Sequence, residues 1–179
     1  MSILASIATG LSAREHETGN LEAKLTLVEY GDFECPRCAQ AEPLTRHLLD
    51  TYGDRLRFVF RHFPDSAAHP HAELAAEAAE AAAAQGKFWP MHAKLFRLPQ
   101  HLEQDALTRY AEELELDTLR FVGDMRDHVY VQRVREHHAA GVRLGLRGTP
   151  SFFLNDTPVD VSFGLEKLEQ AVRAALGEQ

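Results

Sequence analysis

The sequence predicts an α/β fold in which a mixed four-stranded sheet is interrupted by an inserted α-helical subdomain. Three observations support this fold class. Two short apolar runs flank a helical stretch near the N-terminus, a long segment of helical periodicity follows, and two more short runs precede a last amphipathic helix. The chain has 179 residues, 45% of them hydrophobic, which suits one domain with a sizeable core.

The first part of the chain predicts a strand–helix–strand unit. Residues 25–30 and residues 56–63 are short β-prone runs, each followed by a turn or proline signal. From Cys35 onward, apolar residues recur at helical spacing, and Pro36 suits a first helical turn, where no N–H is needed. Two strands joined by a helix favour parallel pairing, which makes the sheet partly parallel.

The middle of the chain, residues 67–146, has almost wholly helical periodicity. The expected helices cover residues 72–84, 88–97, 103–114, 118–125 and 130–144. We therefore expect an N-terminal arm at 1–20, partly disordered or a short helix, then a sheet-containing domain formed by 21–65 and 147–179, with a helical subdomain at 66–146 inserted between its halves.

The last part predicts a strand pair and a helix. Gly148-Thr149-Pro150 interrupts the helical pattern, and residues 151–154 then form a strand with residues 157–161 as a hairpin partner. Residues 165–176 form a final amphipathic helix. Together with the first two strands, this hairpin completes the predicted four-stranded sheet.

Composition limits the function classes. The formal net charge is −8 and the pI is about 5.7, which gives no support for binding nucleic acid or an anionic membrane. No apolar run approaches the ~20 residues that a transmembrane helix needs. Residues 3–11 are apolar but lack the basic region of a secretory leader, so we expect a cytoplasmic protein. The alternative is a periplasmic or otherwise exported protein whose leader has been removed.

The two cysteines, Cys35 and Cys38, are the strongest candidates for chemistry. A disulfide between them closes too small a loop to be a useful structural staple. A zinc site needs about four ligands, yet no second cysteine pair exists and the nearest downstream histidine is His47. The pairs His69/His71 and His137/His138 are expected to be exposed or capping residues. We therefore expect no metal and no other cofactor, with inert buried cysteines as a further alternative.

The spacing of the cysteines suits a redox pair. Residues i and i+3 of a helix are neighbours, so the disulfide can open and close locally. Cys35 lies at the expected helix N-terminus, where a thiolate is favoured, and Cys38 lies one turn further in. Cys35 is thus expected to attack the substrate and Cys38 to resolve the mixed disulfide. The positive charge of Arg37, if exposed, would stabilise the Cys35 thiolate by only about 0.2–1 kcal/mol.

Several motifs resemble the DsbA-like thiol–disulfide oxidoreductases, which have a thioredoxin fold with a helical insertion. The similar segments are residues 28–38, His62-Phe63-Pro64, His69-Pro70, residues 85–92 and residues 148–155. The resemblance spans about residues 25–176, and a CxxC combined with a distant Gly-Thr-Pro-Ser-Phe-Phe is specific. The chain departs from the family in Pro-Arg between the cysteines and in Asn155-Asp156 where an Asn-Gly turn is usual.

The resemblance implies a protein disulfide oxidoreductase that acts on protein or peptide thiols and is recycled by a redox partner. It implies that Pro150 follows a cis peptide bond and that the Thr149 backbone pairs with substrate. Phe33 is expected to line the surface beside Cys35, with a core aromatic as the alternative. Glu29 would assist proton transfer to Cys38, although strand alternation leaves open a surface position for this acid. The direction of electron flow stays open. The alternative is a redox-inactive peptide-binding or chaperone-like module.

Overall fold

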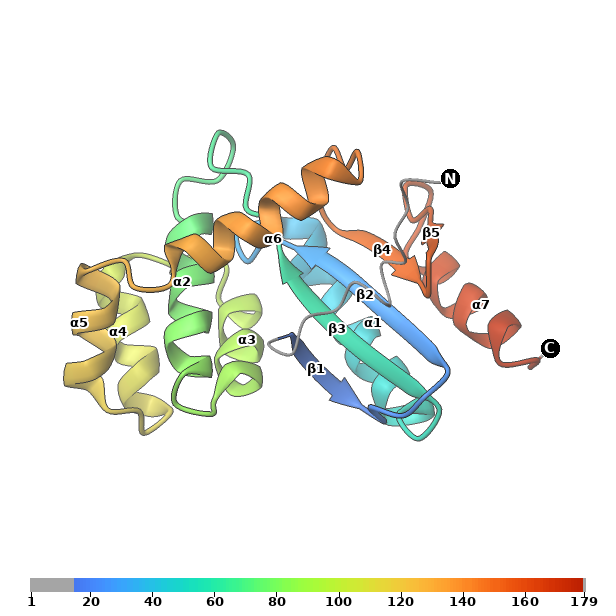
Figure 1. Cartoon of the computed structure of the whole chain (residues 1–179), viewed down its shortest axis with the longest axis horizontal. Helices are drawn as coiled ribbons and strands as arrows, with labels where there is room; N and C mark the ends of the chain where they lie inside the picture. Colours follow the sequence, from blue (N-terminus) through green and yellow to red (C-terminus); the bar gives the residue numbers. More distant parts are fainter. Residues whose placement is uncertain (1–14, 179) are drawn as a thin grey trace.

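A five-stranded mixed sheet runs through the structure, a computed structural model that describes residues 15–178 (Figure 1). Its strand order is β1-β3-β2-β4-β5. The strands are β1 (His16–Gly19), β2 (Leu25–Gly31), β3 (Leu56–His62), β4 (Ser151–Leu154) and β5 (Thr157–Val159). Only β2 and β3 pair in parallel; the other three pairings are antiparallel. This mixed sheet with helices confirms the predicted thioredoxin-like fold class.

Strand β1 corrects the prediction of a disordered or helical arm, at least for residues 16–19. These residues pair with β3 and add a fifth strand to the four expected. Side chains also hold the strand in place: Glu17 forms an ion pair with Arg57 of β3, and its carbonyl accepts a hydrogen bond from Trp89 Nε1 of α3. A four-residue polar strand shows no apolar alternation in the sequence. Residues 1–14 of the predicted arm lie outside the described residues.

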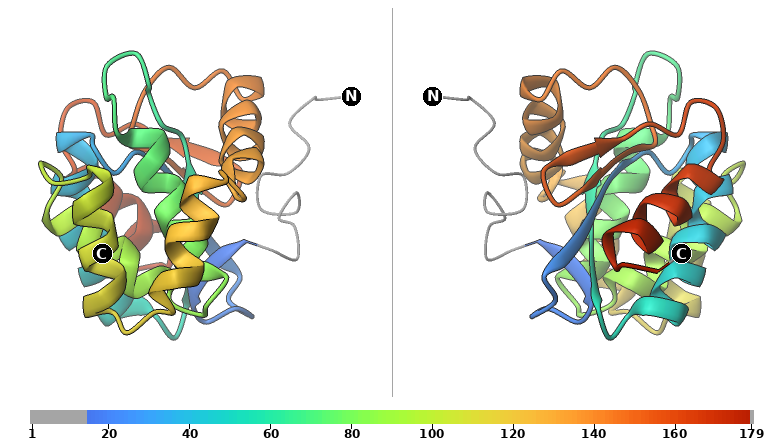
Figure 2. Two further views of the ribbon diagram at one scale, coloured as in Figure 1. Left: turned by 90° about the vertical axis from the view of Figure 1, so that its left-hand side faces the viewer. Right: turned by 90° about the vertical axis from the view of Figure 1, so that its right-hand side faces the viewer.

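Helices cover both faces of the sheet (Figures 1 and 2). Helices α1 (Pro36–Tyr52) and α7 (Glu166–Ala175) lie on one face, and α6 (Val131–Arg143) lies on the other. Alternate residues of β2 supply the two cores: Leu27 belongs to the cluster that includes α1 and α7, whereas Val28 and Tyr30 belong to the cluster beneath the end of α6. Each face of β2 is therefore buried.

The remaining helices form a group beside the sheet, at the left of Figure 1. They are α2 (Ala72–Ala83), α3 (Phe88–Arg97), α4 (Gln104–Glu113) and α5 (Thr118–Arg126). The buried alanines of α2 allow its neighbours to approach closely, and α2 contacts α3, α4, α5 and α6. The sequence periodicity located these helices to within a few residues, because each buries one apolar face. Their treatment as a separate inserted domain stays a prediction.

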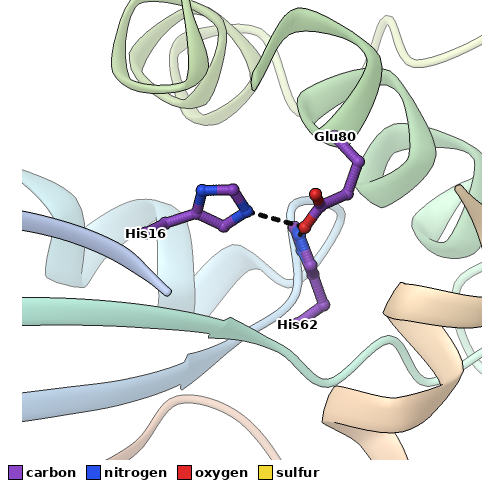
Figure 3. A group of neighbouring side chains, drawn as sticks. All are labelled: His16, His62 and Glu80. Atoms are coloured by element: carbon purple, nitrogen blue, oxygen red, sulfur yellow. Dashed lines mark hydrogen bonds and ion pairs between the residues drawn. The ribbon is translucent and has the colours of Figure 1, made fainter. Parts of the chain in front are cut away.

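A buried polar cluster joins β1, β3 and α2 (Figure 3). Oε1 of Glu80 lies 2.7 Å from Nε2 of His16 and 2.9 Å from Nε2 of His62, while Arg133 Nε lies 2.9 Å from Oε2. Burial alone would raise the pKa of Glu80, but hydrogen bonds from the two histidines hold it well below its ordinary value. The carboxylate thus connects a strand pair to a helix across 64 residues of sequence.

The same cluster corrects the expectation that His137 is exposed. Helix α6 crosses the end of β3, so His137 is buried, stacks on His62 with ring centroids 5.4 Å apart, and accepts a hydrogen bond from the His62 backbone. His16, His62 and Glu80 offer three potential metal-ligand atoms within 4.8 Å of one another. A divalent cation there would meet the fixed charge of Arg133, so we interpret the cluster as a structural ion-pair network.

Within residues 15–178, every helix is too short or too polar to traverse the hydrocarbon layer of a bilayer.

Candidate active site

Cys35 occupies the N-terminal cap of α1, directly after the loop that follows β2. Its backbone is extended, and Pro36 takes the first helical position, where no N–H is required. The backbone N–H groups of Arg37 and Cys38 are therefore free to donate to the Cys35 sulfur. The two cysteines lie 3.8 Å apart, and both thiols are free. Cys35 is 7% exposed and Cys38 is completely buried.

The environment gives the two thiols opposite acidities. A hydrogen bond with Cys38 lowers the pKa of Cys35 most, burial opposes this, and further hydrogen bonds from Thr149 and from the helix N-terminus bring it to about 5. Burial raises the pKa of Cys38 well above its ordinary value, and its hydrogen bond with Cys35 adds to the increase. At neutral pH the pair therefore holds one thiolate, at Cys35, and one proton, at Cys38.

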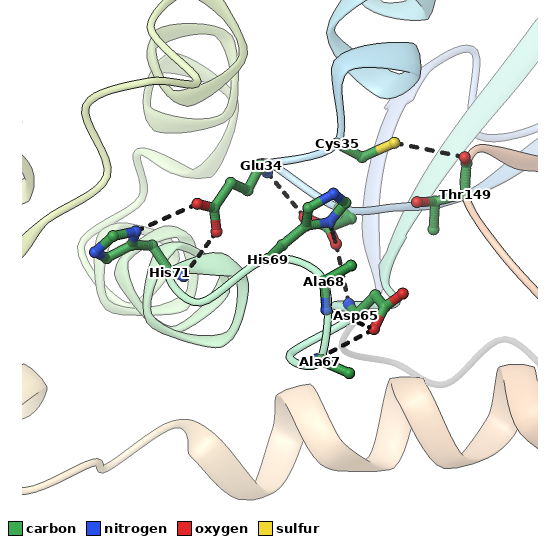
Figure 4. Close-up of polar contacts among 9 residues, drawn as sticks. Glu34, Cys35, Asp65, Ala67, Ala68, His69, His71 and Thr149 are labelled. Carbon is green, nitrogen blue, oxygen red and sulfur yellow. Dashed lines mark hydrogen bonds and ion pairs between the residues drawn. The ribbon is translucent and has the colours of Figure 1, made fainter.

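The segment before β4 faces the first cysteine. The Thr149–Pro150 peptide bond is cis, and Cys35 Sγ lies 3.5 Å from the Thr149 carbonyl oxygen, to which the protonated thiol donates a hydrogen bond (Figure 4). Pro150 is buried immediately before Ser151, the first residue of β4. Because β4 pairs with β2, the sheet brings two segments more than 100 residues apart to the same edge. Thr149 thus lies directly beside the Cys35 sulfur.

Glu29 lies behind the cysteines. It shares the α1 face of β2 with Leu27, since alternate residues of a strand point the same way. The side chain is buried, and Oε1 has no hydrogen-bond partner among the described residues. Burial, with smaller contributions from the charges of Glu42 and Cys35, raises the pKa of Glu29 to about 8. Of the two positions that the sequence left open, the structure shows the buried one.

Phe33 does not lie as expected, and Arg37 makes a contact that the sequence did not indicate. The Arg37 side chain donates a hydrogen bond to the Val161 carbonyl at 2.9 Å, so its guanidinium is engaged with the segment after β5. Phe33 is 1% exposed and packs against Phe60 and Phe96, with ring centroids 5.3 and 4.7 Å away. Its placement on the surface beside Cys35 was wrong, because the ring fills the space between the sheet and α3.

The sequence reasoning missed a polar network on the other side of Cys35 (Figure 4). Buried Asp32 accepts hydrogen bonds from the backbone of Glu34 at 2.8 Å and of Asp65 at 2.9 Å, and its Oδ2 lies 2.8 Å from His69 Nδ1. The one feature of the sequence that pointed to Asp32 was its position shortly before Cys35. Nothing in the local pattern indicated that His69 joins it.

A cleft of about 600 Å³ opens beside the thiol. Cys35 and Thr149 line it together with His69, and its walls combine apolar and charged side chains. The apolar walls come from Phe63, Pro64, Val134 and Leu146, and the charged ones from Asp65, Glu73, Arg135 and Arg147. Such a mixed surface suits an extended peptide better than a small apolar ligand.

Comparisons with known proteins agree with this geometry. A family model described as thioredoxin matches residues 12–174. A thioredoxin-like oxidoreductase from Silicibacter pomeroyi DSS-3 is 30% identical, with a TM-score of 0.81 over 94% of this chain and 95% of that one. BdbD from Bacillus subtilis (20% identity, TM-score 0.80, 91% and 93% covered) and alpha-DsbA1 from Wolbachia pipientis (17%, 0.81, 93% and 93%) share the fold.

The curated proteins that are similar in sequence are named as Na+/H+ antiporters, not as oxidoreductases. Na+/H+ antiporter NhaA 3 of Salinispora tropica is 44% identical over 162 residues, which are 90% of this chain and 25% of that protein. NhaA of Herminiimonas arsenicoxydans is 40% identical over 161 residues, again 90% and 25%. The chain thus spans about a quarter of the length of these relatives.

These relatives overturn the predicted cytoplasmic location. They are named as antiporters, which are membrane proteins, so the prediction of a cytoplasmic protein was wrong. It rested on the missing basic region before residues 3–11, a local pattern that does not determine where a protein is located. With residues 12–174 matched by the thioredoxin model and a 30% identical thioredoxin-like oxidoreductase aligned over nearly its full length, the chain belongs to the thioredoxin family.

Proposed function

We propose that the chain exchanges the Cys35–Cys38 pair with protein or peptide disulfides and thiols through a mixed disulfide at Cys35. The observation that carries this proposal is the opposite acidity of two neighbouring thiols, one at a cleft and one buried. A structural pair of cysteines has no need of this asymmetry, whereas a nucleophile and a resolving thiol require it.

The exchange balances as follows. The Cys35 thiolate attacks one sulfur of a substrate disulfide, forms a Cys35–substrate disulfide, and releases the other substrate sulfur as a thiolate that takes up a proton. Cys38 then loses its proton and attacks the Cys35 sulfur, which closes the Cys35–Cys38 disulfide and releases the second substrate thiol. Two electrons pass from the cysteine pair to the substrate. The reverse sequence oxidises a substrate dithiol, and a redox partner recycles the pair in either direction.

In this mechanism, Glu29 accepts the proton that Cys38 must lose. Its burial behind the pair and its pKa of about 8 suit a group that exchanges a proton near neutral pH. Pro36 and Arg37 act through the backbone: Pro36 opens the helix, and the N–H of Arg37 stabilises the thiolate. The Arg37 guanidinium, engaged with Val161, holds the segment after β5 near the site.

Substrate binding is proposed at the cleft beside Cys35. Thr149 offers backbone groups just before the start of β4, where an extended substrate can pair as an additional strand, and Pro150 sets the position of that segment. The substrates are then protein or peptide segments rather than single small thiols. The direction of exchange depends on the reduction potential of the pair and on its partner.

A trapping experiment tests the proposal. The wild type, Cys35→Ser and Cys38→Ser are incubated with a peptide disulfide, and products are identified by mass spectrometry. We expect turnover by the wild type, loss of all covalent exchange in Cys35→Ser, and an accumulated peptide–Cys35 disulfide in Cys38→Ser. Full exchange by Cys35→Ser would sink the proposal. Peptide binding without exchange by the wild type would instead favour a redox-inactive binding module.

A further inference from the structure

We infer that Asp32 and His69 form a positioning pair that holds a positively charged imidazole against the Cys35 thiolate. This inference rests on the proposed function and adds a residue pair that acts on the nucleophile from outside the CxxC. His69 comes from the segment between β3 and α2, and Asp32 comes from the loop between β2 and α1. They meet across 37 residues of sequence at the mouth of the cleft.

The geometry restrains both side chains. Asp32 is buried and accepts one backbone N–H at each oxygen, from Glu34 and from Asp65, so its carboxylate cannot rotate freely. Oδ2 lies 2.8 Å from Nδ1 of His69, which fixes the imidazole with Nδ1 toward the carboxylate. The opposite edge of the ring is then left on the side of the cleft that Cys35 lines, as Figure 4 shows.

The electrostatics favour a charged imidazole. Partial burial lowers the pKa of His69, but its hydrogen bond to Asp32 and the charges of Asp32 and Cys35 outweigh burial and raise it. The attraction is mutual, so a protonated His69 favours the thiolate form of Cys35. Because the reduced pair contains this thiolate, the imidazolium also makes the pair more oxidising.

Other charged groups face Cys35 and must be considered in a pH profile. Glu34 flanks it, while Cys38 and Glu29 lie behind it. Around the cleft stand Asp65, Glu73, Arg135, His138 and Arg147. His69 differs from these groups because Asp32 fixes the orientation of its imidazole and because the charge of Cys35 raises its pKa.

A substitution can separate the charge from the hydrogen bond. In His69→Gln, the side-chain amide can still donate to Asp32 but carries no charge, so a merely structural role is preserved. The matched control is His71→Gln: His71 lies two residues away and also contacts an acid, Glu34. Its side chain is 45% exposed, against 23% for His69, and it is not among the cleft residues.

The readouts are the pKa of Cys35, from thiolate absorbance against pH, and the reduction potential in glutathione buffers. We expect His69→Gln to raise the pKa of Cys35 by about half a unit, which is about threefold less thiolate below the midpoint, and to make the potential more reducing. His71→Gln should shift neither. If a folded His69→Gln protein kept the wild-type pKa of Cys35 and the wild-type reduction potential, while Cys35→Ser abolished exchange, this inference would be overturned and the proposed function would stand. If Cys35→Ser retained exchange, the proposed function itself would fail.

Discussion

Glu29 of β2 and Cys38 of α1 interact in the buried layer between the sheet and the helix. Burial raises the pKa of each group, and the charge of Glu29 raises that of Cys38 further. Both groups therefore carry their protons at neutral pH, and one must lose its proton before Cys38 can act as a nucleophile. Once ionised, the Glu29 carboxylate, whose Oε1 has no hydrogen-bond partner among the described residues, can accept the Cys38 proton.

Replacing Glu29 with Gln should slow the resolving step. Without a proton acceptor, Cys38 must transfer its proton to water, so we expect the mixed disulfide at Cys35 to persist about 100-fold longer. In the wild type, the resolving rate should rise with pH through about 8, where Glu29 ionises, and this rise should be absent from Glu29→Gln. Quenched-flow mass spectrometry measures both. Equal lifetimes in the two proteins would remove Glu29 from the mechanism.

Removal of the Cys38 hydrogen bond should weaken the acidity of Cys35. This hydrogen bond is the largest cause of the lowered pKa of Cys35. Since a hydrogen bond to a charged group contributes about 1.5–3 kcal/mol, Cys38→Ala should raise that pKa by about 1–2 units above its value of about 5. Cys38→Ser retains a donor and serves as the control, with a smaller increase. The pH dependence of alkylation of Cys35 measures each value, and identical midpoints in the two variants would contradict the assignment.

The buried histidines should make the fold sensitive to acid. Burial lowers the pKa of His137 to about 2 and of His92 to about 3. Their unfolded values lie near 6.5, so below that pH the unfolded chain binds more protons, and stability is lost as pH falls. Each histidine should cost about 2 kcal/mol between pH 6.5 and pH 5.

Urea unfolding at several pH values tests this sensitivity. His137→Gln should flatten the decline in the free energy of unfolding below pH 6.5, whatever its effect on stability at pH 7. His47→Gln, at an exposed position of α1, should keep the wild-type slope. A wild-type stability that stays level from pH 7 to pH 5 would show that the buried histidines are protonated in the folded protein.

Phe33 should matter for stability rather than for substrate binding. Its ring is fully buried among Phe60 and Phe96, so Phe33→Ala should cost about 3–5 kcal/mol of unfolding free energy. The KM for a peptide disulfide should stay close to that of the wild type at temperatures where the variant is folded. A raised KM with little loss of stability would restore the role at the surface that the sequence suggested.

Local features were accessible from the sequence alone. The spacing of Cys35 and Cys38, the proline at the start of α1 and the apolar periodicities depend on residues close in the chain, so they located the cysteine pair and most helices and strands. Only the tertiary structure decided which way Phe33 and Arg37 point and that residues 16–19 pair with β3. The Asp32–His69 and His16–Glu80 contacts join residues 37 and 64 positions apart. Contacts of this kind arise from packing of whole elements, which no local pattern encodes.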